Sequence, residues 1–157
     1  MIGITIKVQE GVLDLTKELE FSGEELNQAY IEQPAKFAYW ASMASKSRFE
    51  LDKAKLAVDR QETYLKKTLY GELDNEIRQK MEMDGEKITE AKVTSRIFSD
   101  KRYLEEQNKL YDLQEKVSEL QYQTDTLYVA KDAFIQRKDM IISLGANIRQ
   151  EKTNIEP

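Results

Sequence analysis

Apolar side chains recur at every seventh position along two stretches of this chain. The first series is Phe37, Ala44, Leu51, Val58 and Leu65, and the second is Leu113, Leu120, Leu127, Phe134, Ile141 and Ile148. A repeat of seven keeps these side chains on one side of an α-helix, where they form the seam along which helices pack. The pattern predicts an all-α fold in which two long helices form an antiparallel hairpin or coiled coil.

Few residues interrupt the two predicted helices. From Pro34 onward only Gly71 disfavours the first helix, until Gly85 provides a residue suited to end it. Thr89 and Asp100 are of the types that cap helix N-termini. The segment EAKVTSRIFS, which lies between these two residues, is therefore predicted to form a short connecting helix.

The spacing of apolar residues changes from seven to four after Leu65. The positions that follow are Leu69, Leu73, Ile77 and Met81. A seam with this shorter spacing drifts around the helix, as it does at a stutter in a coiled coil.

The first 35 residues have a different pattern. Ile2, Ile4, Ile6 and Val8 alternate with other residues, which predicts a short strand or a loosely tethered arm over residues 1–21. Ser22 and Glu25 have the spacing of a capping box, and we expect a short helix that begins there and ends at Pro34.

These boundaries divide the chain into three parts. We expect an N-terminal arm over residues 1–21, a helical domain that oligomerises and binds its ligand over 22–150, and a C-terminal tail over 151–157.

Several apolar residues lie off the seams, at Phe49 and Leu56 and again at Met140, Ile142 and Leu144. A helix that is apolar on more than one side requires more than one partner, which predicts a homo-oligomer. We assign the subunit contacts to the last helix, at Phe134, Ile141, Leu144 and Ile148. The alternative is that the off-seam residues are scattered surface hydrophobes.

The composition argues against most catalytic chemistry. The 157 residues include no histidine and no cysteine, which removes the commonest general base, the thiolate nucleophile and the commonest transition-metal ligands. No glycine-rich phosphate loop and no calcium-loop spacing occurs. We therefore expect no catalytic residues, no metal, no cofactor and no enzymatic activity.

The chain also lacks the features of a signal peptide and any run of about 20 apolar residues. We expect a cytoplasmic protein that does not cross a membrane.

Positive charge is concentrated in one segment of this acidic chain. The net charge is −5, yet residues 36–67 hold eight lysines and arginines against four acidic residues. Lys46, Lys53, Arg60 and Lys67 are spaced by seven, which aligns them opposite the seam. Aromatic residues lie between these cations at Phe37, Tyr39, Trp40, Phe49 and Tyr64.

Cations and aromatic rings in one helix suit a single-stranded nucleic acid, which offers phosphates and unpaired bases. We predict the contact residues to be Lys46, Arg48, Lys53, Lys55, Arg60, Tyr64, Lys66 and Lys67. The alternative is that the cations form the solvated face that any coiled coil presents, with Phe37 and Trp40 in its core.

Three segments resemble the UvsY-type recombination mediators of tailed phages. They are ELNQAYIEQPAKFAYWASMASKSRFELDKAKLAVDRQETYLKKTLYG, the turn DGEKITEAKV and the closing AFIQRKDMIISLGANIRQE, and the likeness covers roughly residues 24–149. The basic element of the family falls on Lys66, Lys67, Thr68 and Leu69. A threonine stands at position 68 where the family has an arginine, which gives more weight to Lys67 and the upstream cations.

The resemblance implies a ring-forming helical oligomer that binds single-stranded DNA. Such a protein helps a RecA-like recombinase to displace the single-strand-binding protein and form its filament, in the host cytoplasm if it is phage-encoded. The competing interpretation is a structural coiled-coil adaptor or scaffold that binds only protein partners.

Overall fold

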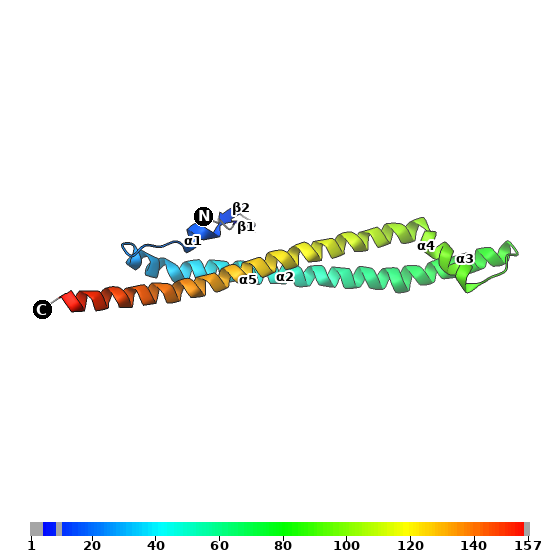
Figure 1. Cartoon of the computed structure of the whole chain (residues 1–157). Helices are drawn as coiled ribbons and strands as arrows, with labels where there is room; N and C mark the ends of the chain where they lie inside the picture. Colours follow the sequence, from blue (N-terminus) through cyan, green and yellow to red (C-terminus); the bar gives the residue numbers. More distant parts are fainter. Residues whose placement is uncertain (1–4, 9–10, 156–157) are drawn as a thin grey trace. The chain divides into compact units, whose positions relative to one another are not determined.

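The computed structural model describes residues 5–8 and 11–155, and helices contain most of them (Figure 1). The helices are α1 (Leu15–Leu19), α2 (Leu26–Thr63), α3 (Tyr70–Met83), α4 (Glu90–Ser99) and α5 (Lys101–Ile155). A π-helical turn, η1 (Tyr64–Leu69), joins α2 to α3, and two short strands, β1 (Thr5–Val8) and β2 (Gly11–Asp14), precede α1. The predicted all-α character is confirmed for everything beyond the two strands.

The strands form the first part of the N-terminal arm. β1 pairs with β2 in antiparallel register, with Thr5 opposite Asp14 and Val8 opposite Gly11. The predicted strand is therefore present, although Ile2 and Ile4, on which the prediction partly rested, lie outside the described residues.

The second part of the arm is the short helix α1, which packs against the rest of the chain. Asp14 caps it, because its carboxylate accepts a hydrogen bond from the Thr16 amide at 3.0 Å. Leu15 is buried, and Leu19 packs beside it. The prediction of a loose tether is wrong for α1, since its apolar side chains contact the helical core.

Pro34 lies inside α2, where the sequence predicted a break. Ser22 caps the preceding turn as expected, with its hydroxyl accepting from the Glu25 amide at 3.3 Å. Proline has no amide hydrogen, so Pro34 cannot form the helical hydrogen bond to the carbonyl of Tyr30. The helix continues because its neighbours are fixed by tertiary contacts, such as the Gln33 side chain donating to the Phe134 carbonyl at 2.6 Å.

Replacing Pro34 with alanine should therefore stabilise the protein. The substitution returns an amide donor to the helix, and we expect the free energy of unfolding to rise by up to about 3 kcal/mol, the difference between the two residues in a helix interior. Urea denaturation followed by circular dichroism measures this change. Ala38→Ser, at an exposed position one turn later, is the control and should change stability by less than about 0.7 kcal/mol. A Pro34→Ala variant less stable than wild type would contradict the prediction.

Helical structure continues from α2 through η1 and α3, and ends at Met83 as predicted. Gly85 adopts a φ of 69°, the left-handed conformation that glycine allows at helix ends. The Thr89 hydroxyl then accepts from the Lys92 amide at 3.3 Å to cap α4. Asp100 caps α5 in the same way, accepting from the Arg102 amide at 2.9 Å. Both predicted caps, and the short helix between them, are confirmed.

The chain divides into two compact units, and the predicted helical domain over 22–150 includes parts of both. Unit 1 comprises Met1–Glu50 and Leu120–Pro157, and unit 2 comprises Leu51–Glu119. The predicted C-terminal tail over 151–157 is helical through Ile155, and residues 156–157 lie outside the described part.

In unit 1, α2 and α5 pack against each other in antiparallel directions. The Ser47 and Thr124 hydroxyls are 2.7 Å apart in the buried interface. Further along, the hydroxyl of Tyr30 donates to the carbonyl of Ile141 at 3.4 Å. The core of this unit consists of Leu15, Trp40, Ala44, Leu127, Ala130 and Phe134.

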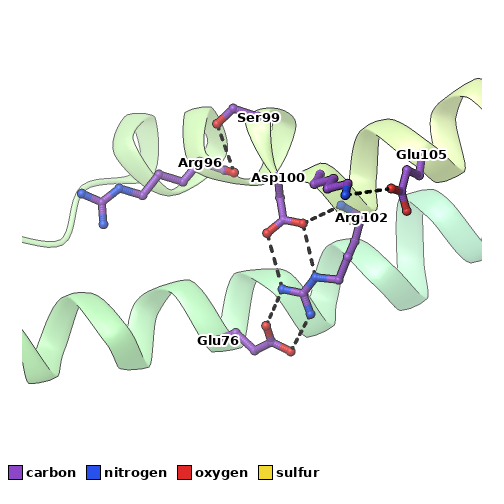
Figure 2. Close-up of polar contacts among 7 residues, drawn as sticks. Glu76, Arg96, Ser99, Asp100, Arg102 and Glu105 are labelled. Atoms are coloured by element: carbon purple, nitrogen blue, oxygen red, sulfur yellow. Dashed lines mark hydrogen bonds and ion pairs between the residues drawn. The ribbon is translucent and has the colours of Figure 1, made fainter.

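Unit 2 combines the second half of α2, η1, α3, α4 and the start of α5. Its core consists of Leu65, Leu69, Leu73, Met81, Val93, Ile97, Tyr103 and Leu110. Charged pairs fasten the elements at the surface, and Figure 2 shows the guanidinium of Arg102 between the carboxylates of Asp100 and Glu76. The hydrogen bonds from Arg102 lower the pKa of both carboxyls. Their contribution to stability is therefore present at neutral pH and is lost as the pH falls below their ordinary pKa range.

Candidate nucleic-acid interface

All eight residues predicted to bind nucleic acid have exposed side chains. Lys46 and Arg48 lie on the part of α2 that belongs to unit 1. The other six lie on the parts of α2 and η1 that belong to unit 2, namely Lys53, Lys55, Arg60, Tyr64, Lys66 and Lys67. Unit 2 thus carries most of the candidate interface on one uninterrupted helical segment.

Within unit 2 the cations of α2 point away from the buried seam. Leu51 is fully buried, whereas Lys53 and Arg60 are exposed. Seven residues of α-helix rise about 10.5 Å, which places these two cations in a row along the outer side. Leu56, also exposed, lies between them in sequence. Such a row of cations suits an extended polyanion better than a small anion.

The π-helical turn η1 moves Lys67 out of this row. The Tyr70 amide donates to the Leu65 carbonyl, an i to i+5 hydrogen bond, so each turn of η1 contains more residues than an α-helical turn. A residue seven positions after Arg60 therefore does not return to the same side of the helix. The predicted single line of cations is therefore offset at Lys67.

The turn also explains the change in the apolar spacing. Leu65, Leu69 and Leu73 are all buried although they are four residues apart. The wider turn keeps them on one side, where a regular α-helix would let them drift.

The cations differ in their internal partners. The Lys66 ammonium donates to the carboxylate of Glu62 one turn earlier, and this bond raises the pKa of Lys66. Across residues 5–8 and 11–155, Lys55, Arg60 and Lys67 take part in no ion pair. A phosphate group can pair with these three without displacing a carboxylate of the same chain.

Trp40 belongs to the core of unit 1 and offers no surface to a ligand. Its side chain is 0% exposed, and its ring lies 5.9 Å from that of Phe134 in a stacked arrangement. Tyr39 packs edge-on against it at 5.7 Å. Of the aromatic residues between the cations, Phe49 and Tyr64 are the exposed ones, at 62% and 40%. The interpretation of Trp40 as a core residue is therefore confirmed.

Unit 2 contains an aromatic cluster that the sequence analysis did not identify. The Phe98 ring lies 6.2 Å from Tyr70 and 5.2 Å from Tyr103, measured between ring centroids. The three rings come from α4, α3 and α5. The one available signal was that Phe98 directly follows Ile97, which with Val93 forms the buried face of α4.

Two of the residues predicted to contact other subunits lie inside unit 1. Phe134 and Ile141 are fully buried by side chains of their own chain, so their surfaces are not available to a second copy. This placement corrects their assignment as interface residues. Leu144 and Ile148 are half-buried. The exposed apolar residues of the same helix lie nearby at Ile135, Met140 and Ile142.

No three histidine, cysteine, aspartate or glutamate side chains among the described residues are grouped so that they could hold a metal ion. In the same part of the chain, no helix is long and apolar enough to cross a membrane. Comparisons with models of known protein families, with curated proteins and with solved structures found no match.

Proposed function

We propose that this protein binds single-stranded DNA through α2 and η1 and acts as a recombination mediator. The observation that carries the proposal is the set of five exposed cations on one helical segment of unit 2, Lys53, Lys55, Arg60, Lys66 and Lys67. Three of them have no ion pair in the described part of the chain. A phosphate backbone is attracted to such a set of cations.

The mediator part of the proposal rests on the resemblance to UvsY-type proteins. In this proposal the two long helices form a hairpin, and several copies assemble into a ring-like homo-oligomer. The assembly holds single-stranded DNA, helps a RecA-like recombinase to displace the single-strand-binding protein, and carries out no chemical step itself. The exposed apolar residues of α5, such as Met140 and Ile142, support an assembly with further protein surfaces.

The fluorescence anisotropy of a labelled single-stranded oligonucleotide tests the DNA-binding step. The full chain is titrated at several salt concentrations, and a duplex of the same length serves as the control ligand. We expect binding that favours the single strand and weakens as salt rises, because phosphate contacts release counterions.

Lys53→Ala combined with Arg60→Ala should weaken this binding without changing helicity or oligomer size. Each lost phosphate contact removes about 0.7 from the slope of log affinity against log salt for single strands. The double variant should therefore show a slope shallower by about 1.4.

The matched control is Lys87→Ala with Lys92→Ala, which removes the same charge from exposed positions elsewhere in unit 2. Equal slopes for the two double variants would contradict the assignment of the interface. If the correctly folded wild type binds no DNA at low salt, the competing function as a protein-binding adaptor is the better account.

A further inference from the structure

Phe98 is unusually exposed for an aromatic residue that belongs to a packed cluster. It lies near the end of α4 and is 49% exposed, whereas Val93 and Ile97 of the same helix are buried. One part of its ring contacts Tyr70 and Tyr103, and the rest faces solvent. Among these three rings, Tyr103 is buried and Tyr70 is half-buried.

The cluster is held in a fixed position by charged hydrogen bonds. The guanidinium of Arg102 donates to Glu76 of α3 at 2.7 Å and to Asp100 at 3.3 Å, two residues after Phe98 (Figure 2). At the other end of α4, Arg78 of α3 donates to Glu90 at 2.7 Å. These pairs connect both ends of α4 to neighbouring elements and so help to position the ring of Phe98.

Cations of the candidate interface lie next to the cluster. Tyr70 directly follows η1, and Lys66 lies four residues before it on the same helical segment. The positive charge of Lys66 also acts on the phenol of Tyr103 and opposes the rise in its pKa that burial causes. Lys66 is therefore near one ring of the cluster, that of Tyr103, and one helical turn before another, that of Tyr70.

We infer that Phe98, supported by Tyr70 and Tyr103, is a stacking platform for an unpaired base, with Lys66 exchanging its Glu62 partner for the adjoining phosphate. This inference rests on the proposed function, and it names the part of the ligand that the aromatic cluster contacts. Exposed aromatic rings beside cations bind single strands because every base has a flat face. A duplex keeps its bases stacked on one another, so the platform predicts a preference for single strands.

The test compares two single-stranded ligands on the full-length protein. One is oligothymidylate, and the other is an oligonucleotide of the same length made of abasic sites, which keeps the phosphates and lacks the bases. Stacking on an aromatic ring contributes about 5- to 150-fold in affinity per base. The wild type should therefore bind oligothymidylate at least about 5-fold more tightly than the abasic strand.

Phe98→Leu keeps an apolar cover over Tyr103 and removes the ring. We expect it to lose about 5- to 150-fold in affinity for oligothymidylate while its affinity for the abasic strand stays at the wild-type value. Phe98→Tyr, which restores a ring, should recover the preference for bases. Tyr122→Leu, at an exposed position in unit 1, is the matched control and should leave both affinities unchanged.

The outcomes separate this inference from the proposed function. A wild type that binds neither ligand overturns both. A Phe98→Leu variant that keeps the wild-type preference for bases overturns the platform alone and leaves DNA binding by the lysines in place. A Phe98→Leu variant that weakens equally on both ligands assigns Phe98 to packing and also overturns the platform.

Discussion

Replacing Phe134 with alanine should lower the free energy of unfolding by about 3–5 kcal/mol, the cost of truncating a buried phenylalanine. The Phe134 ring is fully buried and stacks on Trp40, so the substitution leaves a cavity in the core of unit 1. Urea denaturation followed by the fluorescence of Trp40 measures the change. Because Trp40 is the one tryptophan in the sequence, the signal comes from the site of the substitution.

Ile135→Ala is the control for this variant. Ile135 is the next residue of α5 and is exposed, so its truncation should cost less than about 1 kcal/mol. Equal losses for the two variants would show that Phe134 is not a core residue, and would return it to the role of a subunit contact.

The second large effect is expected at Arg137, a buried cation of α5. Its guanidinium donates to the Leu19 carbonyl at 3.1 Å and to the Gln33 side chain at 2.5 Å, and it lies 5.4 Å from the ring of Phe21. Burial lowers the pKa of Arg137, while the charges of Glu32 and Glu18 raise it. One side chain thus connects the N-terminal segment to both α2 and α5.

Arg137→Ala should lower the free energy of unfolding by about 2–6 kcal/mol, because it leaves two acceptors unpaired, each at a cost of about 1–3 kcal/mol. The amides of α1 should also exchange with deuterium faster, since the helix loses the donor to its last carbonyl. Arg149→Ala, at an exposed position of the same helix, should cause neither change. If the α1 amides of the Arg137→Ala variant exchange as slowly as those of the wild type, contacts other than Arg137 hold this helix in place.

Local sequence signals were sufficient for the helix boundaries in the middle of the chain. Gly85, Thr89 and Asp100 act on the backbone within a few residues of themselves, so their effect follows from their chemistry. The burial of Leu51 and Leu65 follows equally from the repeat of seven. The cations on the opposite side of the same helix are exposed for the same reason, because a helix that buries one side leaves the other in solvent.

Pro34 and η1 could not be predicted in this way. The helix continues past Pro34 because contacts with α5 fix its neighbours, and those contacts join residues about a hundred positions apart. The apolar spacing of four after Leu65 signalled a change, but a drifting seam and a π-helical turn produce the same spacing.

The periodicity also did not identify the partner of each apolar surface. Phe134 and Ile141 were expected to contact another copy, yet the chain covers them with its own residues. A repeat of seven reports only that one side of a helix is apolar. The cluster of Tyr70, Phe98 and Tyr103 was missed for a related reason, since its rings come from three separate helices.

The position of Trp40 has a consequence for how unfolding is observed. Its fluorescence reports on unit 1, while circular dichroism records the helices of both units. Because α2 and α5 are continuous through both units, we expect the two units to lose structure together. Thermal unfolding gives one midpoint by Trp40 fluorescence and another by circular dichroism. The smaller the difference between these two midpoints, the more cooperatively the two units unfold.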